Sequence, residues 1–157
     1  MSQDVRLVEI TQATVDVILG LAVAPEQARF VAPNAVSLAQ AHFEPGAWFR
    51  AIADADDLVG FAMIFDPTLP GAVPWPDLDT RTIMLWRFMI DHASQRRGLG
   101  AAAIARLAAH ARTRPGITRF ATSYSEGPGG PADFYRRTGF VATGRHLEDE
   151  AEAVMHL

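Results

Sequence analysis

The chemically most suggestive stretch of the sequence is Gln95-Arg96-Arg97-Gly98-Leu99-Gly100, which comes directly before the strongest predicted helix. The two glycines have no Cβ, so the backbone there can approach a ligand closely. Free N–H groups at a helix start, together with the helix dipole, favour an anion, and the two arginines add positive charge. We therefore predict that the backbone amides of residues 97–101 hold a phosphate or pyrophosphate. The alternative is a glycine turn that only connects two elements.

Two other phosphate-binding patterns fit this loop poorly. A Walker loop needs Gly-Lys-Ser/Thr, and all 14 basic residues of this chain are arginine. Residues 98–103 match the dinucleotide pattern G-x-G-x-x-G/A, but residues 91–97 separate them from the preceding strand. In addition, no acidic residue ends the next strand, as that pattern requires. Both readings are therefore disfavoured.

The remaining pattern is Q/R-x-x-G-x-G/A after a strand and a short connector, and residues 95–100 fit it completely. The loop resembles the acetyl-CoA loop of the GNAT superfamily of N-acetyltransferases. A second motif agrees, because residues 134–140 have the F-Y-x-x-x-G-F pattern found at a helix end in that superfamily. Within the superfamily, residues 30–38 and 85–91 resemble a bacterial group of diamine or spermine/spermidine acetyltransferases.

The resemblance implies transfer of an acetyl group from acetyl-CoA to a primary amine by direct attack on the thioester. The absence of cysteine is consistent with a mechanism that forms no acyl-enzyme. By resemblance, Tyr135 protonates the departing sulfur; the alternative is that it packs as an amphipathic core residue. The backbone of the central strand is expected to pair with the pantetheine arm, and one of its N–H groups to face the thioester oxygen. The implied cofactor-binding residues are Phe88, Met89, Ile90, Gln95, Arg96, Arg97, Gly98, Leu99, Gly100 and Ala101; no metal is expected.

Two positions depart from the pattern of the superfamily. Polyamine acetyltransferases often place an acidic residue on the central strand, where this chain has Trp86 followed by Arg87. The resemblance therefore does not identify the general base, and the candidates are a water chain or Glu44. Many relatives also carry an asparagine that contacts the cofactor ahead of the catalytic tyrosine, and this chain has Pro128 at that position.

The acceptor is the part of the reaction that the motifs constrain least. The acceptor pocket is expected to be lined by residues 28–48 and by the loop before the central strand. Clustered carboxylates there would favour a polyamine, whereas an exposed Arg50 or Arg87 would favour an acidic acceptor. Alternatives are the amine of an amino acid, an antibiotic or a protein N-terminus, or a CoA-binding sensor without turnover. The candidate substrate residues are Glu44, Trp48, Trp86 and Arg87.

The periodicity of the sequence places these motifs on a mixed α/β domain that spans residues 1–157. Strands are predicted at residues 5–10, 48–53, 58–65, 81–90, 117–123, 140–145 and 151–157. Helices are predicted at residues 15–22, from 34 or 37 to 41, at 99–112 and at 131–137, with a short helical piece at 25–30. The proline-rich segment 66–80 is predicted to be a long hairpin loop or an exposed lid. With the resemblance, the expected fold is a central twisted mixed sheet of about six to seven strands flanked by about four helices.

Composition sets further limits on function. The chain has 157 residues, of which 49% are hydrophobic and 20% charged, as in a folded domain with a real core. Its formal net charge of −4 argues against a nucleic-acid partner. The five histidines match no metal-binding pattern. No apolar stretch reaches the ~20 residues of a membrane helix, and residues 1–4 do not resemble a signal peptide, so no membrane partner and a cytoplasmic location are expected. The closing hairpin is a candidate surface for a homodimer.

Overall fold

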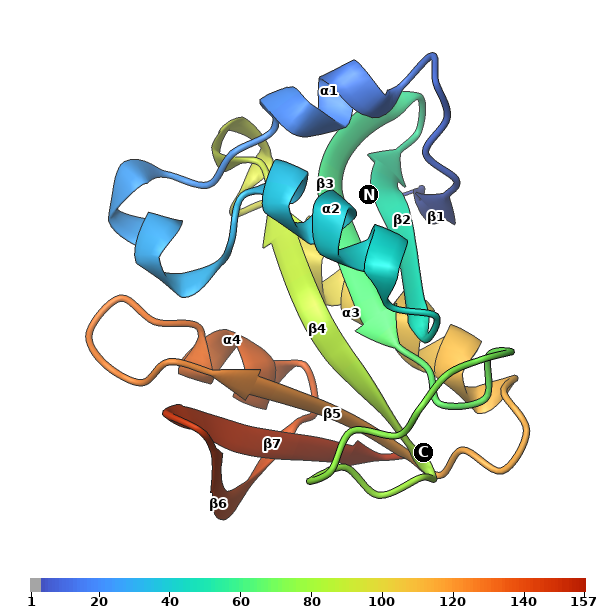
Figure 1. The fold of residues 1–157 in the computed structure, drawn as a ribbon. Coiled ribbons are helices and arrows are strands. Elements are labelled where there is room, and N and C mark those ends of the chain that lie inside the picture. The colour runs from blue at the N-terminus through green and yellow to red at the C-terminus, as the bar shows by residue number, and fades with distance from the viewer. Residues whose placement is uncertain (1–3) are drawn as a thin grey trace.

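A computed structural model describes residues 4–157, so the first three residues of the segment considered above as a signal peptide lie outside it. The described residues form a mixed sheet in the order β1-β2-β3-β4-β5-β7-β6, in which only β4 and β5 run parallel (Figure 1). The sheet confirms the predicted fold class. Its strands are β1 (Val5–Val8), β2 (Ala47–Asp54), β3 (Asp57–Phe65), β4 (Thr82–Ile90), β5 (Arg119–Tyr124), β6 (Val141–Leu147) and β7 (Glu150–His156).

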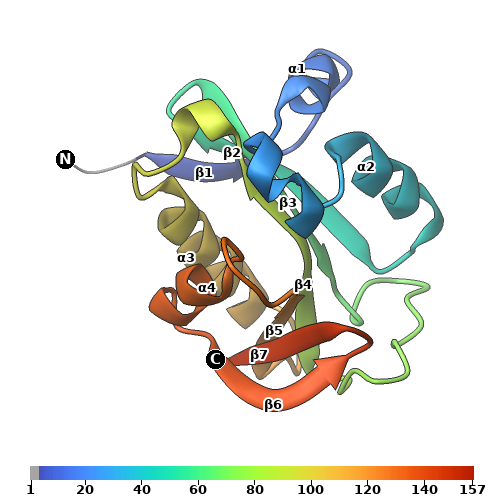
Figure 2. The same ribbon diagram turned by 90° about the vertical axis from the view of Figure 1, so that its left-hand side faces the viewer.

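Helices cover both faces of the sheet. Figure 2 shows α1 and α2 on one side of the strands and α3 and α4 on the other. The elements are α1 (Val15–Gly20), α2 (Asn34–Phe43), α3 (Leu99–Arg112) and α4 (Ala132–Arg137), with the short 3₁₀ segments η1 (Pro25–Phe30) and η2 (His92–Ser94). None of the helices within residues 4–157 has the length and apolar character needed to cross a membrane.

Two elements end earlier than predicted, at places where a side chain accepts a hydrogen bond from a backbone N–H group. The first helix ends at Gly20 rather than at Ala22, because the Ala22 N–H donates to the Asp91 carboxylate at 2.9 Å and is not available to the helix. The first strand ends at Val8 rather than at Ile10, and a turn in which the Thr11 N–H donates to the Thr14 hydroxyl leads into α1. Such local side-chain bonds compete with regular structure.

The largest part of the core lies between α3 and the sheet. The apolar face predicted for this helix is buried as expected and comprises Leu99, Ala103, Ile104, Leu107, Ala108 and Ala111. It packs with strand residues such as Ile83, Leu85 and Phe120 in one cluster. Removing this apolar surface from water is the main term that holds the helix on the sheet. The start of α3, which carries the glycine loop, is thereby fixed beside β4.

The two parallel strands at the centre of the sheet diverge along their length. β4 pairs with β5 only from Thr82 to Leu85, whereas its other edge stays paired with β3 as far as Ile90. Residues 86–90 therefore present one backbone edge that makes no strand pair within the described residues. The divergence is visible in Figure 1, where β5 turns toward β7 and away from β4. Unpaired strand edges readily accept an extended ligand.

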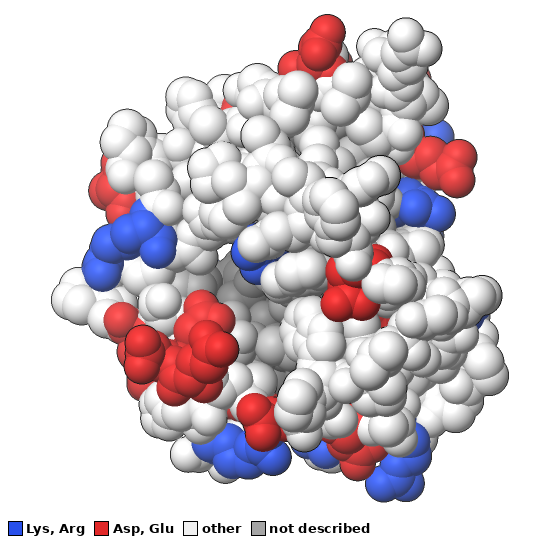
Figure 3. Space-filling view, in the orientation of Figure 1, with Lys and Arg blue, Asp and Glu red and all other residues white. Residues whose placement is uncertain are grey.

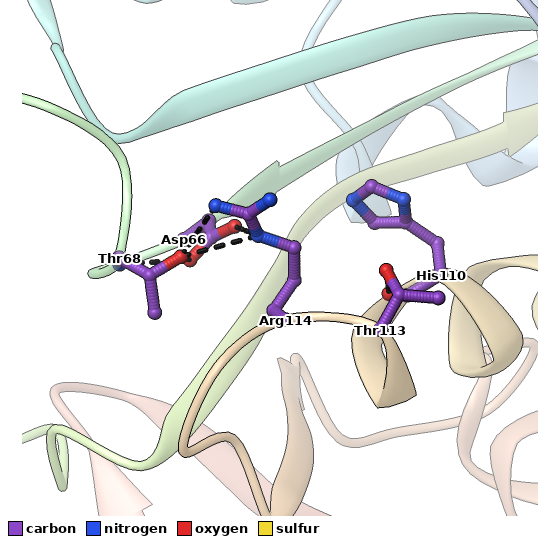
Figure 4. Close-up of polar contacts among 5 residues, drawn as sticks. All are labelled: Asp66, Thr68, His110, Thr113 and Arg114. Atoms are coloured by element: carbon purple, nitrogen blue, oxygen red, sulfur yellow. Dashed lines mark hydrogen bonds and ion pairs between the residues drawn. The ribbon is translucent and has the colours of Figure 1, made fainter.

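Segment 66–81 connects β3 to β4 and is anchored at its start to the end of α3. Asp66 is fully buried, and its carboxylate accepts a hydrogen bond from the Arg114 Nε at 2.9 Å and from the Thr68 hydroxyl at 2.6 Å. The Arg114 Nη2 in turn donates to the Thr68 hydroxyl at 2.9 Å (Figure 4). Further along, Trp75 stacks on Phe65 with ring centroids 4.5 Å apart. These contacts hold the start of the segment and Trp75 in place, as in the long hairpin loop predicted from the sequence.

Candidate active site

The first of two large cavities, about 540 Å³ in volume, lies between the start of α3, the free edge of β4 and the start of α4. Its wall brings together two motifs that are far apart in the sequence, the glycine loop and the Phe134-Tyr135 pair. Residues of η1, including Gln27 and Phe30, close it on the side opposite α4. The cavity therefore follows the gap that opens where β4 and β5 diverge.

The first turn of α3 offers backbone donors to this cavity. Gly98 precedes the helix with a positive φ of 77°, which a residue with a Cβ adopts only at a cost, and no side chain caps the helix. The first N–H groups of a helix have no acceptor within it. Leu99, Gly100 and Ala101 all line the cavity, so their amides are available to an anion. Of the predicted residues 97–101, the cavity lining includes 98–101 and leaves out Arg97.

Some polar residues of the glycine loop line the first cavity, and others hold the loop in place. Arg96 lines the first cavity, whereas the Arg97 guanidinium donates to the Asp54 carboxylate at 2.9 Å and lies outside the lining. Gln95 lines the cavity and uses its side-chain amide to hold the loop, because Nε2 donates to the Ile90 oxygen at 2.9 Å and to the Gln27 side chain at 3.0 Å. Arg137 also lines the cavity, as a second cation that sequence reasoning did not select.

The three strand residues predicted for the cofactor lie in the wall of the first cavity, together with the glycine loop. Phe88, Met89 and Ile90 all contribute to the wall, from the part of β4 that has left β5. The Phe88 ring stacks on Phe134 at 5.8 Å between centroids, which joins the strand to α4. The backbone edge next to these rings has no strand partner on the β5 side within the described residues.

The position at which relatives carry an asparagine lies in a loop that borders the same cavity. The backbone oxygen of Pro128 accepts a hydrogen bond from the Arg29 Nη2 at 2.8 Å, which ties the loop to η1. Gly129 and Gly130 line the cavity, and Gly129 has a positive φ of 77°. The loop therefore presents backbone, without a side-chain amide, to a ligand.

A second cavity, about 780 Å³ in volume, lies on the other side of Tyr135. It is bounded by residues 28–33, residues 75–78, the middle of β4, the end of β5 and the turn between β6 and β7. Figure 3 shows a hollow near the middle of this face, with acidic side chains gathered on one side and basic atoms at its upper edge. Its charged lining residues are Asp77, Glu148, Glu150, Arg29 and Arg87.

Tyr135 stands at the junction of the two cavities and is 8% exposed. It lines both of them, as do Phe30, Val31, Phe88 and Pro131. Burial raises the pKa of the Tyr135 phenol to about 12; the nearby Glu150 carboxylate adds to this effect, and a hydrogen bond with the Thr122 side chain opposes it. Tyr135 is therefore neutral over the whole physiological range and able to donate a hydrogen bond into the junction.

Glu150 is the acidic group closest to this chemistry, and sequence reasoning missed it. It is the first residue of β7, lines the second cavity and accepts a hydrogen bond from the Ser123 hydroxyl at 2.9 Å. Its carboxylate influences the pKa of both Tyr135 and Arg87, so it lies within electrostatic reach of each. No local motif marks it, because it follows a polar turn that looks like ordinary hairpin sequence.

The four residues predicted for the substrate separate into two pairs. Trp86 and Arg87 line the second cavity. Glu44 lies outside both linings, where its carboxylate accepts from the Gly46 N–H at 3.1 Å and from the Trp75 Nε1 at 3.4 Å. Trp48 also lies outside them, stacked on His110 with ring centroids 4.1 Å apart. Trp75 lines the second cavity and belongs to the loop before β4, which was expected to line the pocket; of residues 28–48, only 28–33 do so.

Residues 4–157 contain no cluster of three or more histidine, cysteine, aspartate or glutamate side chains suited to a metal ion. His110, for example, stacks on Trp48, and His146 pairs with Glu126 at 2.8 Å.

Comparison with known proteins supports the assignment of the two motifs. The sequence model described as the acetyltransferase (GNAT) family matches residues 21–140. No curated protein matches the chain. Many solved structures do, at sequence identities that establish the fold alone.

Three of these structures illustrate the likeness. The aminoglycoside acetyltransferase AAC(6')-Ib in complex with coenzyme A has a TM-score of 0.75 and 16% identity, over 99% of this chain and 95% of the other. The GNAT domain of PAT from S. lividans has a TM-score of 0.72 and 19% identity, over 99% and 90%. An acetyltransferase from Thermus thermophilus has a TM-score of 0.66 and 17% identity, over 98% and 97%.

Proposed function

This chain belongs to the GNAT family of acetyltransferases, and from that premise we propose that it transfers the acetyl group of acetyl-CoA to the amine of a small acceptor. The observation that carries the proposal is the position of Tyr135, which lines both cavities at the point where they meet. One cavity has the backbone donors and cations that suit a nucleotide diphosphate. The other has the carboxylates and aromatic rings that suit an organic amine.

The first cavity fits acetyl-CoA by its donor set. The amides at the start of α3 and the cations Arg96 and Arg137 suit the phosphate groups. The free edge of β4 suits the amide groups of the pantetheine arm, because both partners have extended backbone-like geometry. When bound there, acetyl-CoA supplies the activated acyl carbon and the thiol leaving group. Solved structures of similar fold contain CoA, ribostamycin with CoA, or kanamycin with CoA.

Tyr135 serves as the proton donor to the leaving sulfur. A free thiol has a pKa of about 8.5, well below the pKa of about 12 of this phenol. Complete transfer to an ordinary thiolate would therefore be uphill. The same burial disfavours a free thiolate in the junction and raises its proton affinity. Tyr135 thus stabilises the sulfur first by hydrogen bonding and then by protonation.

Glu150 serves as the group that takes a proton from the acceptor. An alkyl ammonium, whose pKa is about 10, has no lone pair for attack at neutral pH. Glu150 accepts one proton from it; the N–C bond then forms as the C–S bond breaks. The nitrogen loses a second proton, which balances the one that Tyr135 supplies to sulfur. The net reaction releases one proton, and Glu150 is the residue that removes it.

The proposal is tested by measuring thiol release with acetyl-CoA over a panel of amines, beside calorimetry of acetyl-CoA binding. We expect Tyr135→Phe to lower kcat about 10²-fold or more while the Kd for acetyl-CoA stays the same. The matched control is Tyr124→Phe, which removes the hydroxyl of the neighbouring ring that stacks on Tyr135 with centroids 5.6 Å apart. We expect the decrease in kcat of Tyr124→Phe to stay below about tenfold. Full activity of Tyr135→Phe would contradict the role of this residue. Binding of acetyl-CoA without thiol release from any amine would favour the sensor alternative.

The finer predictions made from the sequence stay predictions. A polyamine acceptor rests on the resemblance of residues 30–38 and 85–91 to a narrower group. A homodimer through the closing hairpin and a cytoplasmic location also await measurement.

A further inference from the structure

Arg87 occupies an unusual place for a cation, half-buried on the central strand of the sheet. It lies where the register between β3 and β4 shifts, so that Met63 is opposite Arg87 and Ile64 is opposite Leu85. Such a bulge re-aims the side chains beside it, and both Trp86 and Arg87 line the second cavity. Burial lowers the pKa of the Arg87 guanidinium, and the Glu150 carboxylate partly offsets this.

The hydrogen bonds of Arg87 hold its side chain without neutralising it. Nη2 donates to the Gln40 side-chain oxygen at 3.0 Å, and Nη1 donates to the Trp86 backbone oxygen at 3.1 Å. Both acceptors are uncharged. Across residues 4–157, none of the ion pairs includes Arg87, and its buried Nε has no hydrogen-bond partner. A guanidinium has five N–H donors, so N–H groups remain on both terminal nitrogens.

Of the other charged residues around this cavity, Asp77 and Glu148 are exposed, and Arg29 and Glu150 have hydrogen-bond partners. Arg29 donates to the Pro128 oxygen and packs over the Phe30 ring at 4.2 Å. Glu150 accepts from Ser123, yet it is near enough to Arg87 and Tyr135 to act on both electrostatically. The cavity thus presents a carboxylate on β7 beside the reaction centre and a guanidinium on β4.

We infer that Arg87 binds a carboxylate of the acceptor, so that the second cavity selects an amine that also carries a carboxylate group. This inference rests on the proposed function and deepens it, because it names the chemical class of the acceptor. The ammonium end faces Glu150 and Tyr135, where the reaction occurs. The carboxylate end accepts hydrogen bonds from the terminal nitrogens of Arg87, a planar fork that matches a carboxylate well.

A polycation fits the part of this cavity beside Arg87 less well than an amino carboxylate does. Three of the five charged lining residues are carboxylates and two are arginines, and Arg87 donates its hydrogen bonds to uncharged acceptors. A second ammonium group placed beside Arg87 would be repelled at short range in a poorly solvated site. A carboxylate there supplies the counter-charge instead.

The inference is tested with pairs of acceptors that differ only in the carboxylate. The probes are glycine, L-leucine, L-phenylalanine, L-glutamate and 4-aminobutyrate, each beside its amide, with spermidine and kanamycin as cations that lack a carboxylate. We expect wild-type kcat/KM to be highest for one of the acids. Arg87→Gln should lower kcat/KM for that acid about tenfold or more. The kcat/KM for the corresponding amide should stay nearly unchanged. The difference in amine pKa between acid and amide cancels in the ratio of variant to wild type.

Two further variants keep the test specific. Arg87→Lys retains the charge but not the fork, and should restore part of the preference for the acid. Arg81→Gln removes an exposed arginine just before the same strand, outside both cavities, and should leave all ratios unchanged. Thermal unfolding and acetyl-CoA affinity close to wild type show that each variant is folded. An equal loss for acid and amide, or a wild-type preference for spermidine or kanamycin, overturns the inference.

Calorimetry separates this inference from the proposed function. The same acids and amides are titrated into protein saturated with CoA, for wild type and Arg87→Gln. If no amine releases thiol, the proposed function fails, and binding alone then decides the inference. Binding of an acid but not its amide, lost in Arg87→Gln, supports the carboxylate site. Absence of any such difference overturns it.

Discussion

The ring of Phe134 lies 3.1 Å from the point at which a β-carbon on residue 100 would stand, so the ring rests against Gly100 where a larger residue would crowd it. The contact joins the first turn of α3 to α4. It brings the two sequence motifs into one wall of the first cavity. Tyr135, the next residue along α4, is placed by the same contact.

Substitution of Gly100 should therefore weaken acetyl-CoA binding more than it weakens the fold. Alanine favours a helix interior over glycine by about 1 kcal/mol, which offsets the displacement of the Phe134 ring. We expect Gly100→Ala to raise the Kd for acetyl-CoA several-fold and Gly100→Val to raise it more than tenfold, with little change in the melting temperature. Gly20→Ala is the control, because nothing lies within 4 Å of its added carbon. Unchanged affinity in Gly100→Val would show that the ligand does not use this wall.

Loss of the Arg114 side chain should destabilise the protein strongly. Asp66 is 0% exposed, and Arg114, 29% exposed, is its ion-pair partner at 2.9 Å. Removing one partner of a buried pair costs about 3 kcal/mol or more, because the other charge stays buried. We expect Arg114→Ala to lower the free energy of unfolding by this amount in urea titration. Arg136→Ala breaks an exposed ion pair with Asp133 and should change the free energy of unfolding by less than about 0.5 kcal/mol. Similar losses of stability in the two variants would contradict the special cost of the buried pair.

Replacement of Glu150 should produce a defect that depends on pH. If this carboxylate takes the proton of the ammonium, it is needed only while the acceptor is protonated. We expect Glu150→Gln to lower kcat/KM about 10²-fold at pH 7, and the deficit to shrink as the pH approaches the pKa of the acceptor amine. The neighbour Asp149, exposed and outside both cavities, provides the control Asp149→Asn. A deficit of constant size at all pH values would instead indicate a role in binding.

The buried phenol of Tyr135 should make the protein lose stability at alkaline pH. Its pKa is raised from 10.0 to about 12 in the folded state. Between these values the unfolded chain loses the proton and the folded chain keeps it, so stability falls as pH rises. The difference corresponds to about 3 kcal/mol. Urea titrations from pH 9 to about 12 should show a shallower decline for Tyr135→Phe than for wild type; parallel declines would contradict the buried state of this phenol.

Much of the molecule follows from local sequence. The extent of α3 and its buried face follow from apolar residues that recur with helical spacing, and the structure confirms both. The glycine loop is also a local feature, since Gly98 and Gly100 act through the absence of a Cβ at a helix start. The match to the acetyltransferase (GNAT) family confirms what this loop and the Phe134 to Phe140 motif predicted together.

The sequence predicted Trp86, Arg87 and the loop before β4 as lining of the acceptor cavity, and the tertiary structure decided which other residues complete it. Glu150 reaches Ser123 and the surroundings of Tyr135 only because β7 pairs with β5, and no spacing in the sequence encodes that neighbourhood. Trp75 lines the cavity, while Trp48 is turned to His110, although both are tryptophans in regions where a pocket was expected. A period of two or 3.6 residues tells which face of an element is buried. Which elements become neighbours depends on long-range packing, and that packing places the charges at the site.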